Sequence, residues 1–295
     1  MKKIINLFRL EPRIDKLKLI NFESTLPLKV LLRWKIYTIG CSFLALFQDK
    51  KKKNNVLEEK GFCILGKINF DMDELGIKTA AEHIEEVFKQ GPANKTYLDL
   101  PRINHPPLEE FVANFLEAYT ENICELLGSN FQAYWTYTYR TLAGGVNALD
   151  SSFAWHYDEY HPKLYKIFIY LGDTFARNGA FRTFDKTISR DLFRKGFISN
   201  TQERRVRSQA LISDQILRQC HTIEGVAGTA FIFDNKLVHR GTYPLEGQRT
   251  VICIEVYPSH HPFKSSNARN SVFMPMSDDF PAFPWRNPYA AGLST

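Results

Sequence analysis

Cysteine is scarce in this chain of 295 residues. The five cysteines are odd in number, lie far apart and form no Cys-x-x-Cys pair: Cys41, Cys63, Cys124, Cys220 and Cys253. Such spacing excludes a typical zinc ribbon and gives no disulfide framework. It favours a reducing compartment, so we expect the protein to be cytoplasmic.

We expect no secretory signal, and the sequence has no long apolar run. Its first residues are basic and lead into a mixed, charged stretch. The best membrane candidate, residues 26–48, contains Lys29, Arg33 and Lys35, and its uncharged part is too short to cross a bilayer. This segment can be a basic amphipathic helix in peripheral contact with a membrane, or a helix packed on the main domain.

Positive charge is unevenly distributed. The net charge is +6, with 38 Lys and Arg against 32 Asp and Glu. Residues 1–60 hold fourteen basic against six acidic residues, and residues 182–218 hold nine against four. Either region can face an anionic surface or substrate, or can simply be solvated. No nucleic-acid partner is expected, because few aromatic residues interleave with the basic ones in residues 182–218.

Composition and periodicity divide the chain into three parts. Residues 1–55 are predicted to be a basic N-terminal extension, and residues 273–295 an extended tail rich in proline and aromatic residues. Between them, residues 56–272 alternate strands with turns and long connections, which is typical of an antiparallel barrel or double-sheet jelly roll. Residues 187–218 have a helical composition and are expected to form an insertion over one mouth of the barrel.

Helices and strands can be placed within the central part. Helices are predicted from Asp73 to about Gln90 and, with the clearest apolar stripe, over Leu108–Leu127. Aromatic and β-branched runs predict five strands, at residues 61–65, 131–142, 166–171, 229–233 and 250–257. The fold class is therefore mostly β with helical additions.

A histidine and a carboxylate stand two residues apart in Trp155-His156-Tyr157-Asp158. In an extended segment, residues i and i+2 point to the same face, so His156 and Asp158 can reach one ion while Tyr157 packs on the other side. His239, after a predicted strand, can supply a third ligand. Two imidazoles and one carboxylate leave part of the metal open, which suits ferrous iron that binds a cosubstrate and dioxygen. His-x-Asp alone occurs often by chance.

Arg249, ten residues after His239, strengthens the metal-site hypothesis. It opens the last predicted strand after a turn at residues 245–248. A hairpin of this length would return its second strand beside the first, so Arg249 would point into the same interior as His239. A buried guanidinium needs a fixed anion, and the distal carboxylate of an iron-chelating dicarboxylate supplies one. The alternative is an exposed arginine at a strand edge.

Together, His156, Asp158, His239 and Arg249 resemble the Fe(II)/2-oxoglutarate-dependent dioxygenases, and within them the phytanoyl-CoA dioxygenase-like branch. The resemblance covers roughly residues 56–260. It implies a double-stranded β-helix, a cupin-like jelly roll, flanked by helices. It also implies Fe(II) as cofactor and 2-oxoglutarate and O2 as cosubstrates. Hydroxylation of an unactivated C–H bond in a small or medium organic substrate would accompany the release of succinate and CO2.

Further contacts follow from the resemblance. Family members often carry a Ser or Thr shortly after the second histidine, which points to Thr242. A second contact often comes from the strand before His-x-Asp, which points to Tyr139 or Arg140. The family's Asn-Gly turn is matched in residues 166–181, but residues 182–185 depart from the Pro-Gly-Ser-His segment that often follows. If residues 187–218 form a lid, their arginines could bind a phosphorylated or CoA-linked substrate; a solvated helical surface is the alternative.

Two other functions are compatible with the sequence. One is a non-enzymatic jelly-roll binding module, associated with a membrane through residues 26–48. It has no need of a buried Arg249 beside a metal ligand. The other is a metal-dependent hydrolase that uses the same three ligands to activate water. It would need further carboxylates or histidines, and Glu159 and His161 are close by in the sequence.

Overall fold

The computed structural model describes residues 36, 38–43, 56–91, 95–101, 105–145, 152–158, 164–199, 201–259 and 261–264. The predicted C-terminal tail lies outside the described residues. So does the N-terminal extension, apart from residues 36 and 38–43, which are helical. The proposed amphipathic segment at residues 26–48 is therefore described only in these few positions. In the part of the chain that is described, no helix is both long and apolar enough to span a bilayer.

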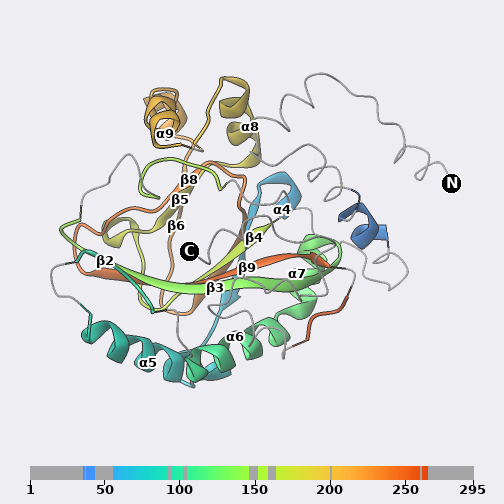
Figure 1. Cartoon of the computed structure of the whole chain (residues 1–295), viewed down its shortest axis with the longest axis vertical. Helices are drawn as coiled ribbons and strands as arrows, with labels where there is room; N and C mark the ends of the chain where they lie inside the picture. Colours follow the sequence, from blue (N-terminus) through green and yellow to red (C-terminus); the bar gives the residue numbers. More distant parts are fainter. Residues whose placement is uncertain are drawn as a thin grey trace, which may run out of the picture.

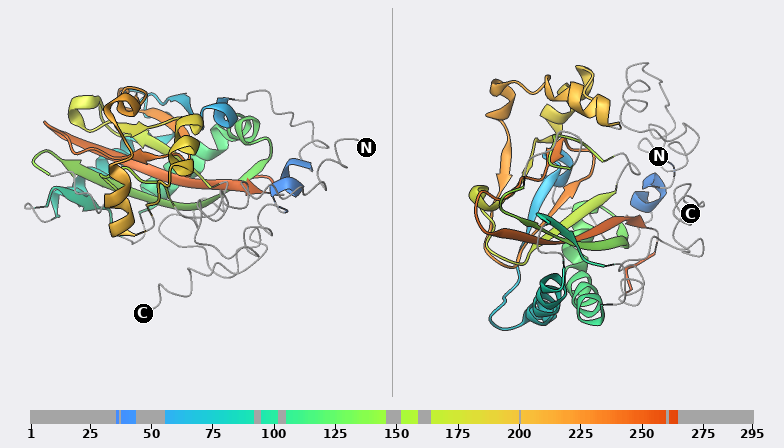
Figure 2. Two further views of the ribbon diagram at one scale, coloured as in Figure 1. Left: turned by 90° about the horizontal axis from the view of Figure 1, so that it is seen from above. Right: turned by 60° about the vertical axis from the view of Figure 1, so that its left-hand side comes forward.

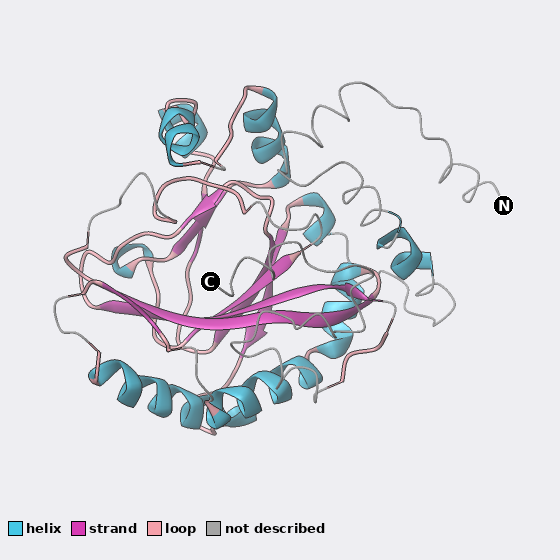
Figure 3. Ribbon diagram, viewed as in Figure 1, coloured by secondary structure: helices cyan, strands magenta, loops and turns pink. Residues whose placement is uncertain are grey.

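A six-stranded antiparallel sheet forms the centre of the molecule (Figures 1 and 3). Its strands, in spatial order, are β1 (Phe62–Lys67), β7 (Thr229–Asp234), β4 (Tyr165–Tyr170), β9 (Gln248–Ser259), β3 (Asn130–Leu142) and β2 (Tyr97–Asp99). All five predicted strands are present in this sheet. β3 and β9 pair along almost their full length and form the longest strand pair of the sheet.

A second antiparallel sheet has three short strands in the order β6 (His221–Ile223), β5 (Phe181–Thr183) and β8 (His239–Arg240). Strands this short leave no alternation to detect, so the sequence did not predict them. The two sheets share one buried cluster of mostly aromatic side chains. In it, Phe181 of the small sheet lies 5.3 Å, between ring centroids, from Phe168 of the large sheet. The two sheets therefore face each other.

Helices cover the opposite face of the large sheet (Figure 1). They are α5 (Ile77–Lys89), α6 (Pro106–Ala118) and α7 (Thr120–Leu127), while the single turns α4 (Val56–Glu59), η1 (Glu74–Gly76) and η2 (Ala176–Asn178) lie in connections. Strand β4 shows how the sequence builds both layers. Ile167 and Ile169 belong to the cluster shared with the helices, and Phe168 and Tyr170 to the cluster between the sheets.

Two helix predictions need correction. Leu108–Leu127 is not one helix: it breaks at Tyr119, where φ is −96° and ψ is 11°. Next to this break, the Thr120 hydroxyl donates to the Leu116 carbonyl (2.6 Å), a local bond of the kind that bends helices. The helix expected from Asp73 begins at Ile77, although the Asp73 carboxylate still accepts hydrogen bonds from two amides of its first turn.

The predicted helical insertion contains α8 (Lys186–Arg194), α9 (Gln202–Gln209) and α10 (Asp214–Leu217) (Figures 1 and 2). Its apolar residues form a cluster with Trp155, Tyr157 and Phe184, whose side chains point outward from the segments beside the small sheet. The insertion therefore packs against the outer side of these segments.

Candidate metal and cosubstrate site

His156, Asp158 and His239 converge in the interior between the two sheets. One potential ligand atom from each lies within 4.8 Å of the others. The closest carboxylate oxygens are 3.7 Å from His156 Nε2 and 3.6 Å from His239 Nε2. Within the described residues, this is the one group of three His, Cys, Asp or Glu side chains placed to share an ion.

The backbone positions the three candidate ligands. His156 forms an isolated antiparallel bridge with His239, with N–H···O=C hydrogen bonds of 2.9 and 2.7 Å in the two directions. The Asp158 amide donates to the Asn235 carbonyl (2.9 Å). The His-x-Asp segment thus adds an extended edge beside β8, and i, i+2 alternation turns both ligands inward. As predicted, Tyr157 points the other way, and its ring packs on Phe193 of the insertion.

Both imidazoles are oriented for metal binding through Nε2. His156 Nδ1 lies 2.9 Å from the Ala154 carbonyl oxygen, and His239 Nδ1 lies 2.8 Å from that of Leu237. A carbonyl only accepts, so each neutral ring carries its proton on Nδ1 and presents the Nε2 lone pair. Burial, reinforced by the neighbouring His239, lowers the pKa of His156 to about 3; burial also lowers the pKa of His239. The rings are therefore neutral at pH 7, as metal binding requires.

The donor set fits a divalent transition metal. Imidazole suits iron, zinc, copper and nickel, and two histidines with one carboxylate are the ligands of non-haem iron sites that keep open positions. The described fold and site thus define an antiparallel-sheet protein with an interior two-histidine, one-carboxylate site.

Lys166 is a further residue of the site, and it was not predicted from the sequence. Its Nζ lies 2.8 Å from Asp158 Oδ2, 3.3 Å from Glu255 Oε1 and 3.2 Å from the Tyr137 hydroxyl. Burial alone would raise the pKa of Asp158, but the charge and hydrogen bond of Lys166 hold this pKa well below its ordinary value. Lys166 therefore keeps Asp158 ionised and restrains one of its oxygens.

Lys166→Met should destabilise the metal-free protein by about 3–5 kcal/mol, because it leaves Asp158 as an uncompensated buried charge. Urea unfolding of the metal-free protein measures the loss. Arg194→Met is the control. It breaks an exposed ion pair with Asp191 and should cost no more than about 1 kcal/mol. An equal effect of both substitutions would contradict the role given to Lys166.

Glu255 should make stability depend on pH. Burial, opposed by the charge of Lys166, raises its pKa from an ordinary 4.5 to about 7. Between these values the folded protein keeps a proton that the unfolded chain has lost, so this contribution to stability falls as the pH rises from 4.5 to 7. Glu255→Gln removes the titration. Relative to the wild type, its free energy of unfolding should rise by a few kcal/mol across this range, since one pKa unit corresponds to about 1.4 kcal/mol.

Urea unfolding of the metal-free wild type and Glu255→Gln at several pH values between 4 and 8 measures this difference. A difference that stays constant with pH would show that Glu255 titrates normally in the folded protein.

Arg249 is among the largest fully buried side chains, with 2% of its surface exposed. Its guanidinium donates to the Gly179 carbonyl and lies 5.6 Å from the centroid of the Tyr139 ring. Its Nε–H is buried without a hydrogen-bond partner, and no ion pair with a carboxylate is found in the described parts of the chain. Arg249 is therefore a buried cation with unused hydrogen-bonding capacity beside the triad.

The route by which Arg249 reaches the site differs from the predicted hairpin. β8 ends at Arg240 and pairs with β5, whereas β9 pairs with β3 and β4. The chain after β8 therefore crosses from the small sheet to the large one. His239 and Arg249 share an interior because the sheets face each other, so the predicted hairpin is wrong although the two residues do come together.

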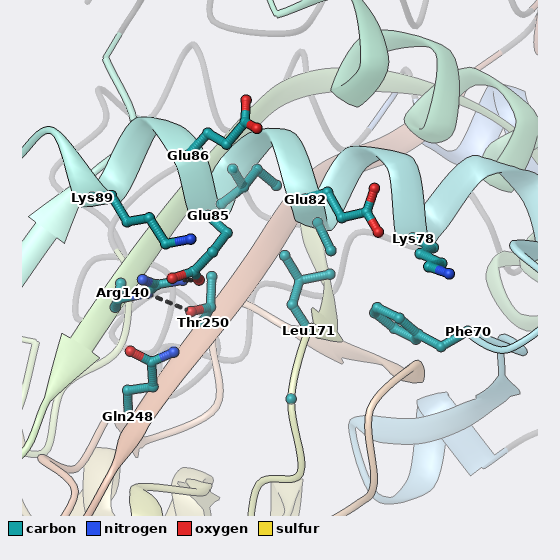
Figure 4. A pocket seen from close by; sticks show the side chains of 13 residues that line it. Phe70, Lys78, Glu82, Glu85, Glu86, Lys89, Arg140, Leu171, Gln248 and Thr250 are labelled. Carbon is teal, nitrogen blue, oxygen red and sulfur yellow. Dashed lines mark hydrogen bonds and ion pairs between the residues drawn. The ribbon is translucent and has the colours of Figure 1, made fainter.

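Strand alternation separates the two candidates on β3. Tyr139 lines the cavity of the triad. Arg140 points to the other face of the sheet, where it pairs with Glu85 of α5 and donates to the Thr250 hydroxyl (2.8 Å) (Figure 4). The cavity there, of about 460 Å³, lies between α5 and the large sheet. Of the two, only Tyr139 can contact a molecule bound at the triad.

Thr242 lies beside the Asn-Gly turn instead of lining the cavity. Its hydroxyl donates to the Ala180 carbonyl (3.1 Å). Gly179 in this turn has a φ of 91°, and a Cβ atom there would lie 2.7 Å from the Thr242 carbonyl oxygen. A glycine is thus needed for the turn to approach this close and to present its own carbonyl to Arg249.

The cavity at the triad has a volume of about 90 Å³. Lys166 and Arg249 line it together with the metal-ligand candidates. The remaining walls are mostly aromatic, with Tyr97, Tyr137, Tyr139, Phe153, Phe168 and Phe181. The site therefore combines two cations and a metal-binding triad with apolar, ring-lined walls.

No protein-family model and no curated protein matches the chain. Solved structures that resemble it include HygX from Streptomyces hygroscopicus with nickel and 2-oxoglutarate bound (TM-score 0.46, 13% identity, 70% of this chain and 86% of that one). Another is SnoK, a non-heme α-ketoglutarate-dependent carbocyclase from nogalamycin biosynthesis (TM-score 0.48, 13% identity, 70% and 82%). A third is the nickel complex of the non-heme monooxygenase ThoJ (TM-score 0.44, 16% identity, 68% and 75%).

Proposed function

We propose that this chain is an Fe(II)/2-oxoglutarate-dependent oxygenase and that its two sheets form a double-stranded β-helix. The observation that carries the proposal is Arg249, a buried cation with unused donors in the same cavity as His156, Asp158 and His239. A metal-dependent hydrolase or a jelly-roll binding module has no need of this arginine, so both alternatives are less favoured.

Each residue has a distinct role in this proposal. His156, Asp158 and His239 hold Fe(II), which together with 2-oxoglutarate and O2 supplies the oxidising chemistry and yields succinate and CO2. Arg249 binds the distal carboxylate of 2-oxoglutarate through its guanidinium. Tyr139, whose ring centroid lies 5.6 Å from the Arg249 guanidinium, would lie near that carboxylate. Thr242 would have to release the Ala180 carbonyl before its hydroxyl could donate to the cosubstrate.

The substrate is a small or medium organic molecule that is hydroxylated at an unactivated C–H bond. The aromatic walls suit an apolar part of such a molecule, as is usual for small-molecule sites. Lys166 is occupied by Asp158 and Glu255, so an anionic group on the substrate would need another partner. The phytanoyl-CoA dioxygenase-like branch remains a prediction from the sequence motifs.

Turnover of 2-oxoglutarate by the anaerobically iron-loaded protein tests the function. We expect O2-dependent release of succinate and CO2, and an absorption change when 2-oxoglutarate is added to the iron-loaded protein without O2. Neither signal should appear with Asp158→Ala. If the wild type shows neither signal, the proposal is wrong, and hydrolysis supported by zinc without 2-oxoglutarate would favour the hydrolase.

A further inference from the structure

Two arginines lie side by side on the face of the small sheet that points away from the metal cavity. Arg182 of β5 and Arg240 of β8 are direct partners across the antiparallel pair. Their chain neighbours Phe181 and His239 contact each other on the inner side, with ring centroids 5.3 Å apart. Adjacent residues of a strand point to opposite faces, so both guanidiniums lie on the outer side.

Trp155 supports both guanidiniums. The Cζ atoms of Arg182 and Arg240 lie 5.8 and 4.8 Å from the centroid of its ring. The ring itself is buried and stacks on Phe184, with centroids 4.5 Å apart. Its backbone is fixed by Gln209 of α9, whose side chain bonds both the amide and the carbonyl of Trp155. The two guanidiniums therefore pack against an aromatic ring that is held in place by its neighbours.

The pair carries positive charge without a carboxylate. Like charges directly opposite each other on a sheet are destabilising. Yet neither Arg182 nor Arg240 forms an ion pair within the described residues, and the Nε–H of each is buried with no hydrogen-bond partner. The Cys220 thiol is a polar neighbour of both arginines. Burial raises the pKa of this thiol, although the charges of both arginines oppose the rise.

We propose that Arg182 and Arg240 form a binding site for a phosphate group, separate from the metal cavity. Guanidinium groups match the oxygens of a phosphate with paired hydrogen bonds, and one dianion would offset both positive charges. Both side chains are partly exposed, so a small anion can reach them from solvent. The group can be free phosphate or the phosphate of an ester, because the same guanidinium donors recognise both.

A bound phosphate would stabilise the layer that carries two of the metal-ligand candidates. Arg240 directly follows His239, and Trp155 directly precedes His156. The phosphate would cross-link β5 and β8 through their side chains, next to the bridge between His156 and His239. Its effect is therefore on the stability of the folded protein, and its measurement does not depend on catalysis.

Thermal unfolding of the full chain, loaded with Ni(II) and saturating 2-oxoglutarate, tests the site. These ligands are supplied so that the cavity is not the place where added phosphate binds. Inorganic phosphate, methyl phosphate and chloride are compared at constant ionic strength. For the wild type we expect Tm to rise by about 2–5 °C for each tenfold increase in phosphate above Kd, and chloride to have no such effect. A shift with both phosphates indicates a site that accepts esters, and a shift with inorganic phosphate alone indicates a site for the free ion.

Matched variants locate the binding. Arg182→Gln combined with Arg240→Gln should abolish the phosphate-dependent shift, whereas Arg190→Gln, the same charge change at an exposed position of α8, should retain it. If the double variant does not fold, Arg182→Gln alone, which leaves the neighbour of His239 in place, should reduce the shift. No phosphate-dependent shift in the wild type, or an undiminished shift in the arginine variants, overturns the proposal.

Discussion

His239→Ala is expected to abolish 2-oxoglutarate turnover and to weaken the binding of a divalent metal by more than about 100-fold. Loss of a residue that merely supports a metal ligand typically costs 10- to 100-fold in affinity, and loss of a ligand should cost more. His239 also exchanges two backbone hydrogen bonds with His156, but alanine keeps these. The loss should therefore reflect the imidazole alone. Titration of the metal-free protein with Ni(II) in a calorimeter measures it.

His221→Ala is the control for this substitution. His221 lies in the same small sheet, on β6, but its side chain is exposed and is not among the residues of the metal cavity. The control should bind metal as the wild type does. If His239→Ala keeps its native circular dichroism spectrum and binds metal with unchanged affinity, the triad is not the metal site.

The sequence predicts the large sheet well because its strands are long enough to show alternation. β3 and β9 have thirteen and twelve residues, and both were placed within a few residues of their ends. β5 and β8 have three and two residues, and what holds them in place is pairing with segments far away in the chain. Local patterns carry no information on such pairing.

The metal-ligand candidates His156 and Asp158 could be predicted because they lie close together in the sequence. His156 and Asp158 need only an extended backbone to share a face, and the sequence suffices for that. The path from His239 to Arg249 could not be predicted. A connection of ten residues can form a hairpin within one sheet or can cross from one sheet to the other. Which of the two occurs depends on how the two sheets are placed, and the local sequence does not show this.

Lys166 left a signal in the sequence that could have been used. In the strand that contains it, Lys166, Phe168 and Tyr170 alternate onto one face, which the two aromatic residues mark as interior. A lysine on such a face requires a buried counter-charge. Asp158 could have been named as one. Glu255 could not, because it becomes a neighbour only through the pairing of β4 with β9.

Arg249→Ala should weaken 2-oxoglutarate binding by about 2–5 kcal/mol, which is roughly 30- to 5000-fold in Kd, and leave metal affinity nearly unchanged. The proposed partner carboxylate would lose the guanidinium of Arg249, whereas the three metal-ligand candidates keep their contacts. Arg249→Lys should recover only part of the affinity, because an ammonium cannot form the paired hydrogen bonds of a guanidinium. Calorimetric titration of the Ni(II)-loaded protein with 2-oxoglutarate measures the cosubstrate affinity, and titration of the metal-free protein with Ni(II) measures the metal affinity.

A cosubstrate analogue separates the carboxylate contact from a general disturbance of the cavity. 2-Oxopentanoate has the same carbon chain as 2-oxoglutarate but no distal carboxylate, so the wild type should bind it far more weakly. In Arg249→Ala the two acids should bind with similar affinity, because the group that distinguishes them is gone. Arg177→Ala removes an exposed arginine that pairs with Glu246 near the same turn, and it should keep the wild-type preference. A wild type that binds both acids equally would show that Arg249 has another function, since a buried guanidinium facing a distal carboxylate must discriminate between them.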